Sequence, residues 1–133
     1  MPVPKIKHCL VCDDVRFELH SKLGVTGLYG ITPDLSILVG QLALPVRLCF
    51  LFLGGPGDGE FLFRAEIRDK TGTPLPAIPV PSSVKVPITP KYTSSMVVFW
   101  FPEIKFPQAG PYTIVLFSDN EPIFSSQFGI AVA

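Results

Sequence analysis

Apolar and polar residues alternate with a period of two along much of the chain, and this pattern constrains the fold most. Between Phe61 and Arg68 every second residue is apolar, and most of the intervening residues are charged. Successive side chains of a β-strand point to opposite faces, so this segment is expected to have one dry and one wet face. From Tyr112 to Phe117, Tyr112, Ile114 and Leu116 alternate with Thr113, Val115 and Phe117, which also predicts a strand. No amphipathic helix of ten or more residues is apparent.

Glycine and proline divide the chain into short extended segments. The sequence predicts a long strand from Pro4 to Leu19, kinked at Asp13-Asp14, that returns through a turn at His20-Ser21-Lys22 into a strand from Leu23 to Ile31. The next segment, Pro33–Ala43, fits either a short edge strand or a single helical turn.

Prolines are concentrated between Pro74 and Pro90. Because proline donates no hydrogen bond to a ladder, this stretch is expected to form an edge that switches between sheets. Short strands with frequent turns, roughly seven to nine in number, predict an all-β, antiparallel two-sheet β-sandwich of immunoglobulin-like or C2-like type. The 133 residues fit a single domain, residues 1–133.

Composition excludes several classes of function. Lys plus Arg number 11 and Asp plus Glu also number 11, so the net charge is zero and no nucleic-acid partner is expected. Charged residues make up 17% of the chain and its mean hydropathy is +0.42, which is unlike a disordered protein. No apolar run reaches the ~18 residues of a membrane helix, so no membrane partner is expected. The first twelve residues lack a signal sequence, which predicts a cytoplasmic protein.

Two segments are apolar on both faces. Val46–Leu53 contains one charge, Arg47, and Met96–Phe101 contains none. An exposed apolar face would be a partner surface, most simply that of a homodimer, or else a ligand groove. Alternatively, Pro33–Ala43 or the proline-rich stretch folds over it. The residues expected at such an interface are Trp100, Val98, Leu51 and Leu53.

The cysteines Cys9, Cys12 and Cys49 do not form a disulfide framework or a complete zinc site. Cys9 and Cys12 are three apart, so on a strand they should point to opposite faces and act as buried structural thiols. A metal-dependent enzyme that uses Asp13, Asp14 and either His8 or His20 is a further alternative. No cofactor is predicted.

The Asp13-Asp14 pair precedes Arg16. Neighbouring strand residues face opposite ways, so the two carboxylates do not form an acid/base pair. Asp14 and Arg16 share a face and are expected to form a structural ion pair. Either aspartate could also accept backbone N–H bonds at the kink, and a cation-binding role is the alternative.

Aromatic residues raise the possibility of a stacking platform for sugars or bases. Trp100, Tyr112, Phe117 and Phe124 are the candidates, although core packing is the better expectation. Gly54–Gly59 lacks the Lys-Ser/Thr of a phosphate loop and is expected to be a hairpin turn.

Two stretches resemble a bacterial family of uncharacterised small proteins. Cys12-Asp13-Asp14-Val15-Arg16, Lys22-Leu23 and Leu28-Tyr29-Gly30 are similar to its opening, and Phe106-Pro107 through Leu116 with the Asp119-Asn120 turn is similar to its closing hairpin. That hairpin is also common in immunoglobulin-like sandwiches. The resemblance implies a bacterial or phage origin and a β-sandwich, and it implies no activity.

These observations predict a non-catalytic cytoplasmic module that binds proteins or has a structural role, and that self-associates through an apolar sheet face. The partner is expected to be a second copy or another protein. The alternatives are a small-ligand or carbohydrate binder and a metal-dependent enzyme.

Overall fold

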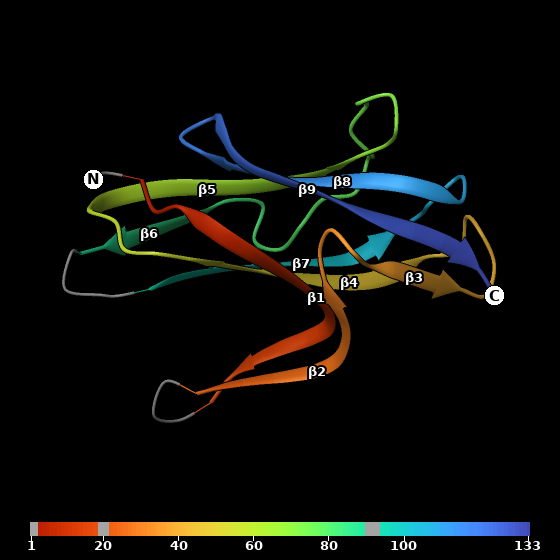
Figure 1. Ribbon diagram of the computed structural model, residues 1–133, viewed down its shortest axis with the longest axis horizontal. Helices are drawn as coiled ribbons and strands as arrows, with labels where there is room; N and C mark the ends of the chain where they lie inside the picture. Colours follow the sequence, from red (N-terminus) through yellow and green to blue (C-terminus); the bar gives the residue numbers. More distant parts are fainter. Residues whose placement is uncertain (1–2, 19–21, 90–93) are drawn as a thin grey trace.

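The computed structural model describes residues 3–18, 22–89 and 94–133. In these residues nine strands form two sheets, which confirms the predicted all-β sandwich (Figure 1). The strands are β1 (Ile6–Phe17), β2 (Leu23–Ile31), β3 (Ser36–Val39), β4 (Val46–Gly54), β5 (Gly59–Arg68), β6 (Val84–Ile88), β7 (Ser95–Ile104), β8 (Gly110–Ser118) and β9 (Glu121–Val132).

The four-stranded sheet has the order β2-β1-β4-β7 and the five-stranded sheet the order β3-β9-β8-β5-β6. All neighbouring strands are antiparallel except β3 and β9, which are parallel. The segment Pro33–Ala43, which the sequence left open, contains the short edge strand β3.

A central core fills the space between the two sheets. The four-stranded sheet contributes Phe50 and Phe99, and the five-stranded sheet contributes Phe63 and Phe128, all with at most 2% of their surface exposed. Phe50 packs against Phe128 across the layers, with ring centroids 5.6 Å apart. Burial of a large apolar side chain contributes about 1.5–3 kcal/mol, so these facing rings hold the sheets together.

The strand order matches that of an immunoglobulin-like domain once β2 is set aside. β1, β4 and β7 then occupy the places of strands A, B and E, and β5, β8 and β9 those of C, F and G. Tyr112, near the start of β8, adds a second mark of this fold. Its hydroxyl donates to the backbone carbonyl of Gln108 (2.7 Å), which is the tyrosine corner found at this position in immunoglobulin-like domains.

The proline-rich stretch switches between sheets, as the sequence predicts. Val80 exchanges two backbone hydrogen bonds with Trp100 at the outer edge of β7 (2.6 and 2.9 Å). The chain then enters β6, the edge strand of the other sheet. The stretch therefore covers one sheet edge before it forms another.

β1 bends sharply and separates from β4. Its ladder with β4 ends at the pair Cys12 and Cys49, while its ladder with β2 continues to Phe17 and Leu23, with an irregularity between Val11 and Cys12. The bend therefore lies next to the predicted kink. The predicted turn residues His20 and Ser21 lie outside the described residues.

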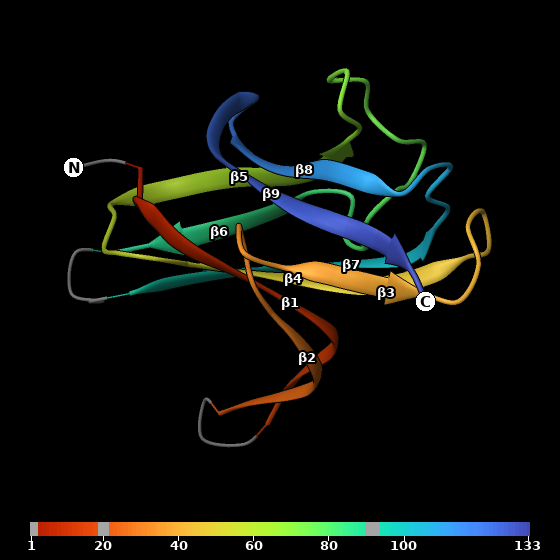
Figure 2. The same cartoon turned by 45° about the vertical axis from the view of Figure 1, so that its right-hand side comes forward.

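We call β2 and the part of β1 beyond Cys12 the arm. Figures 1 and 2 show it projecting from the sandwich on the side opposite β5, β8 and β9. None of the described residues between Cys12 and Asp34 belongs to the central core. The arm is thus an addition to the immunoglobulin-like frame, inserted between β1 and β3.

The tyrosine corner should contribute measurably to stability. We expect Tyr112→Phe to lower the free energy of unfolding by about 1–2 kcal/mol, because it removes a hydroxyl that bonds to the backbone at Gln108. Urea unfolding measures this loss. Tyr29→Phe is the matched control, since the Tyr29 hydroxyl bonds in an exposed position. An equal loss in both variants would contradict the structural role of Tyr112.

Candidate functional site

The face of the four-stranded sheet that points away from the central core carries a second apolar cluster. We call it the outer cluster. Its buried members are Cys12, Val15, Cys49, Leu51 and Val98, and the partly buried side chains packed against them are Leu10, Leu23, Leu53, Met96 and Trp100. Side chains alternate along β4 and β7, so one set of apolar residues fills the central core and the other set forms this cluster.

The four residues predicted as an interface all belong to the outer cluster, but they differ in how much of their surface is exposed. Leu51 and Val98 are only 3% and 7% exposed, so they are already covered within the chain. Leu53 and Trp100 stay partly exposed. Cover by another part of the chain, the alternative to a partner surface, therefore holds for Leu51 and Val98, and an interface at Leu53 and Trp100 stays a prediction.

Part of this cover comes from the bent hairpin rather than from the segments expected to provide it. Val15 and Leu23 of the arm pack into the outer cluster. The segment Pro33–Ala43 instead contributes Leu35, Ile37 and Val39 to the central core. The proline-rich stretch pairs with the outer edge of the sheet at Trp100, and its side chains Leu75, Ala77, Val84 and Val86 pack against the central core.

Trp100 joins three parts of the fold. Its indole N–H donates to the Asp14 carboxylate (2.9 Å), and its backbone pairs with Val80. The ring of Phe17 lies edge-on to the indole, with centroids 6.3 Å apart. The same carboxylate oxygen of Asp14 accepts the backbone N–H of Val15 (2.9 Å). These contacts hold the base of the arm against β7.

The predicted ion pair between Asp14 and Arg16 is not among the ion pairs that the described residues form. Asp14 instead accepts the backbone N–H of Val15 at the bend, which is the alternative role predicted from the sequence. Its bond to Trp100 joins residues 86 positions apart, and no local signal in the sequence indicates it.

Asp13 has a different partner from Asp14. Its carboxylate accepts a hydrogen bond from the Tyr29 hydroxyl (2.7 Å). Burial, together with this bond and the nearby negative charge, raises the pKa of Tyr29 to about 12. Asp13 also covers Gly27, whose φ of 62° and lack of a side chain let the carboxylate approach the β2 backbone. The two aspartates therefore point to separate sites and do not act as a pair.

The three thiols are buried and free. Cys9 belongs to the central core and Cys12 to the outer cluster, as their spacing predicts. The Cys12 thiol donates to the carbonyl of Cys49 (3.8 Å). Burial is the main cause that raises the pKa of all three thiols. Within residues 3–18, 22–89 and 94–133, no three His, Cys, Asp or Glu side chains are grouped so as to hold a metal ion. His20, one candidate ligand, lies outside these ranges.

The four aromatic residues considered as a stacking platform lie in different layers. Tyr112 is in the central core and Phe124 packs against it. The guanidinium of Arg64 lies over the ring of Phe117, with its carbon Cζ 3.8 Å from the ring centroid. Trp100 is on the outer face of the other sheet. They form no common platform.

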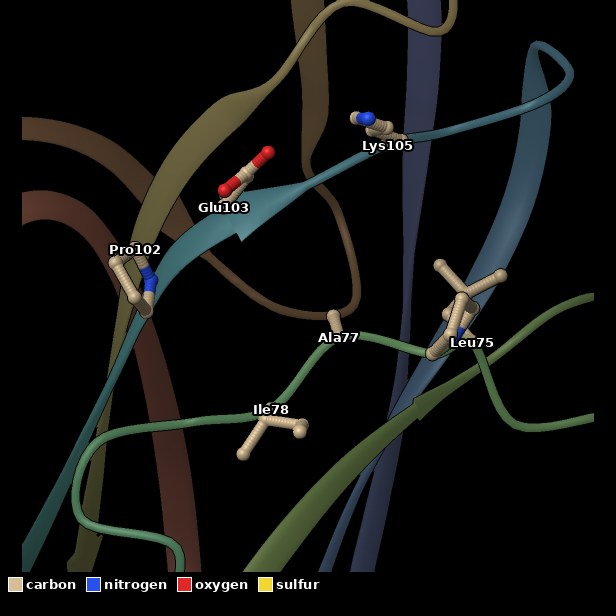
Figure 3. Close-up of a pocket in the computed structure, with 7 residues that line it drawn as sticks. Leu75, Ala77, Ile78, Pro102, Glu103 and Lys105 are labelled. Carbon is tan, nitrogen blue, oxygen red and sulfur yellow. The ribbon is translucent and has the colours of Figure 1, made fainter.

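An open groove lies between the proline-rich stretch and the end of β7. Its volume is about 400 Å³, and its lining residues are Leu75, Pro76, Ala77, Ile78, Pro102, Glu103 and Lys105. Figure 3 shows Leu75, Ala77 and Ile78 on one side, facing Pro102, Glu103 and Lys105. Trp100 is not part of the lining, although it precedes Pro102 by two residues on β7.

The arm also exposes apolar side chains of its own. Of the twelve large apolar residues that are exposed among those described, five belong to the arm: Phe17, Val25, Leu28, Tyr29 and Ile31. Their exposed fractions range from 40% to 64%. The partly exposed Leu53 and Trp100 lie at the base of the arm, next to these exposed apolar side chains.

A family profile described as "Family of unknown function (DUF6941)" matches residues 7–131. This confirms the resemblance to a family without a known activity. The crystal structure of an immunoglobulin-like protein from Pseudomonas aeruginosa is similar to this chain over 91% of each chain, at 12% identity and a TM-score of 0.38. No curated protein matches the chain. The immunoglobulin-like assignment rests on the strand order and on Tyr112. No helix in the described part of the chain is long and apolar enough to cross a membrane.

The contact between Asp14 and Trp100 should show energetic coupling. We expect Asp14→Ala to destabilise the protein by about 1–2 kcal/mol, and less so when Trp100 is already replaced by Phe, because the donor is then gone. A double-mutant cycle with urea unfolding measures the coupling. Asp13→Ala is the control and should be additive with Trp100→Phe. If the effects of Asp14→Ala and Trp100→Phe on stability were also fully additive, this would contradict the hydrogen bond between Asp14 and Trp100.

The thiols should resist modification in the folded state. We expect Cys9, Cys12 and Cys49 to react slowly with an aromatic disulfide reagent at pH ~8, because burial raises their pKa and keeps the thiolate fraction low. In concentrated urea all three should react at once. Fast reaction of any thiol in the native protein would show that its cover opens.

Proposed function

We propose that this chain, which belongs to the DUF6941 family of unknown function, is a non-catalytic module that associates with itself through the apolar surface of the arm. The immunoglobulin-like sandwich acts as a rigid support, and the arm carries the contact surface. The proposed setting is the cytoplasm of a bacterium, which agrees with three free thiols and no disulfide among the described cysteines.

The observation that carries this proposal is the concentration of exposed apolar side chains on the arm. Monomeric soluble proteins seldom display large contiguous apolar patches, and those they have are commonly binding sites. The arm is not needed to close the central core, since it contributes no residue to it. The apolar side chains that the arm exposes beyond its base close neither the central core nor the outer cluster, and a partner explains them best.

A second copy is the simplest partner for this surface. The net charge of the chain is zero, so two copies do not repel each other at long range. In a two-fold dimer each copy presents the same patch, so the patch has to complement itself. A surface made mainly of apolar side chains meets this requirement without matched charges.

A small-ligand module is the second candidate, and the groove in Figure 3 is the observation that favours it. Trp100 lies close by on β7, partly exposed. Trp100 is the only tryptophan, so its fluorescence would respond to a ligand bound beside it. A fluorescence screen against sugars and nucleotides tests this candidate, and a saturable change would favour it over the interaction module.

Sedimentation tests the primary proposal. We expect the protein to form a dimer at tens of micromolar in analytical ultracentrifugation, because the arms bury their apolar side chains against each other. Raising the salt concentration should not dissociate an apolar dimer. A protein that remains a monomer throughout this range would refute self-association.

A further inference from the structure

The two sheets have four edges, and three of them are protected. Strand β3 is only four residues long, and β6 contains Lys85 and Pro87. The outer edge of β7 is capped where Val80 exchanges two backbone hydrogen bonds with Trp100. Short strands, charges, prolines and covering segments are the usual ways in which a protein prevents an edge from pairing with another chain.

The fourth edge, β2, has none of these protections. It is nine residues long, and the segment Leu23–Ile31 contains neither a charged residue nor a proline. Five consecutive residues in its middle, from Val25 to Tyr29, are exposed. Its outer side therefore presents backbone groups and apolar side chains that have no neighbouring strand among residues 3–18, 22–89 and 94–133.

The arm consists of only two strands, which is too few for a stable structure without further support. Beyond Cys12, β1 pairs with β2 and no longer with β4. A two-stranded ribbon is marginally stable in water unless a third strand or a packed face supports it. The outer cluster supports its base, through Val15 and Leu23. A further strand along β2 would support the remainder.

We propose that the outer edge of β2 pairs antiparallel with β2 of a second copy, which joins the two four-stranded sheets into one. This inference rests on the proposed self-association and identifies the surface that carries it. Backbone hydrogen bonds between the two edges supply the pairing, and side chains such as Leu28 and Tyr29 pack across the junction.

The charges near β2 favour a second copy as the partner. The strand itself is uncharged, so self-pairing places no like charges of β2 opposite each other. The nearest charge is Asp13 on β1, whose carboxylate lies over Gly27. Lys22 immediately precedes β2, and Asp34 follows its end; both are exposed. An antiparallel arrangement puts the start of one β2 beside the end of the other. Lys22 of each copy then lies near Asp34 of its partner.

The shape of β2 sets where the pairing can run. Gly27, with a φ of 62°, interrupts the extended backbone in the middle of the strand. Two runs remain, Leu23–Thr26 and Leu28–Ile31. With a two-fold axis near Gly27, the first run of each copy pairs with the second run of the other.

A matched pair of lysine substitutions tests the surface. Leu28→Lys places a charge on the β2 edge, and Leu38→Lys places one on the edge strand β3; these leucines are 57% and 67% exposed. We expect Leu28→Lys to weaken the dimer by about tenfold or more, and Leu38→Lys to leave it unchanged, in sedimentation equilibrium. Circular dichroism checks that both variants keep the β fold.

The outcomes separate the two proposals. A wild-type protein that is monomeric at tens of micromolar refutes self-association and the β2 edge together. A wild-type dimer that Leu28→Lys leaves intact preserves self-association and refutes the β2 edge. A dimer that both lysine variants weaken equally also refutes the β2 edge, because the effect would then follow from charge alone.

A charge exchange tests the antiparallel direction. Lys22→Glu and Asp34→Lys should each weaken the dimer at low salt, and the double variant should restore it. Within one chain these residues lie at opposite ends of a strand roughly 30 Å long, so they cannot form the pair themselves. If the double variant dimerises no more tightly than the weaker of the two single variants, the antiparallel arrangement is refuted.

Discussion

Both faces of the four-stranded sheet are apolar, and each face has to be covered by a different part of the chain. Arg47 is the only charge in β4, and Met96–Phe101 of β7 has none. The five-stranded sheet covers the inner face through the central core. The outer face would be left in water if β1 stayed flat beyond Cys12. The bend in β1 brings Val15 and Leu23 onto this face, and the position of the arm follows from that requirement.

The main features of the sandwich could be predicted from local patterns. Alternation in Phe61–Arg68 identified a half-buried strand, and the prolines identified the stretch that changes sheets. Tyr112–Phe117 was also identified as a strand, but Val115 and Phe117 are buried as well, so this strand is covered on both faces. These predictions succeeded because period, turn residues and proline geometry act between near neighbours. The opposite orientation of Cys9 and Cys12 followed from the same reasoning.

The cover of the outer face could not be predicted in this way. It depends on where β1 leaves β4, and on a hydrogen bond between Asp14 and Trp100, which are remote in sequence. The sequence marked a kink at Asp13-Asp14, next to the bend at Cys12, and singled out Trp100. It could not show that Asp14 and Trp100 meet, so it left open whether Leu51 and Val98 are covered, as they are.

The arm leaves and re-enters the frame at neighbouring points. Leu10 pairs with Ile31, and the backbone N–H of Thr32 donates to the carbonyl of Cys9 (3.0 Å). A loop closed at its base in this way can gain or lose residue pairs without displacing either sheet. Relatives that share the frame are thus free to carry arms of different length and composition, and a foreign hairpin could be grafted at the same junction.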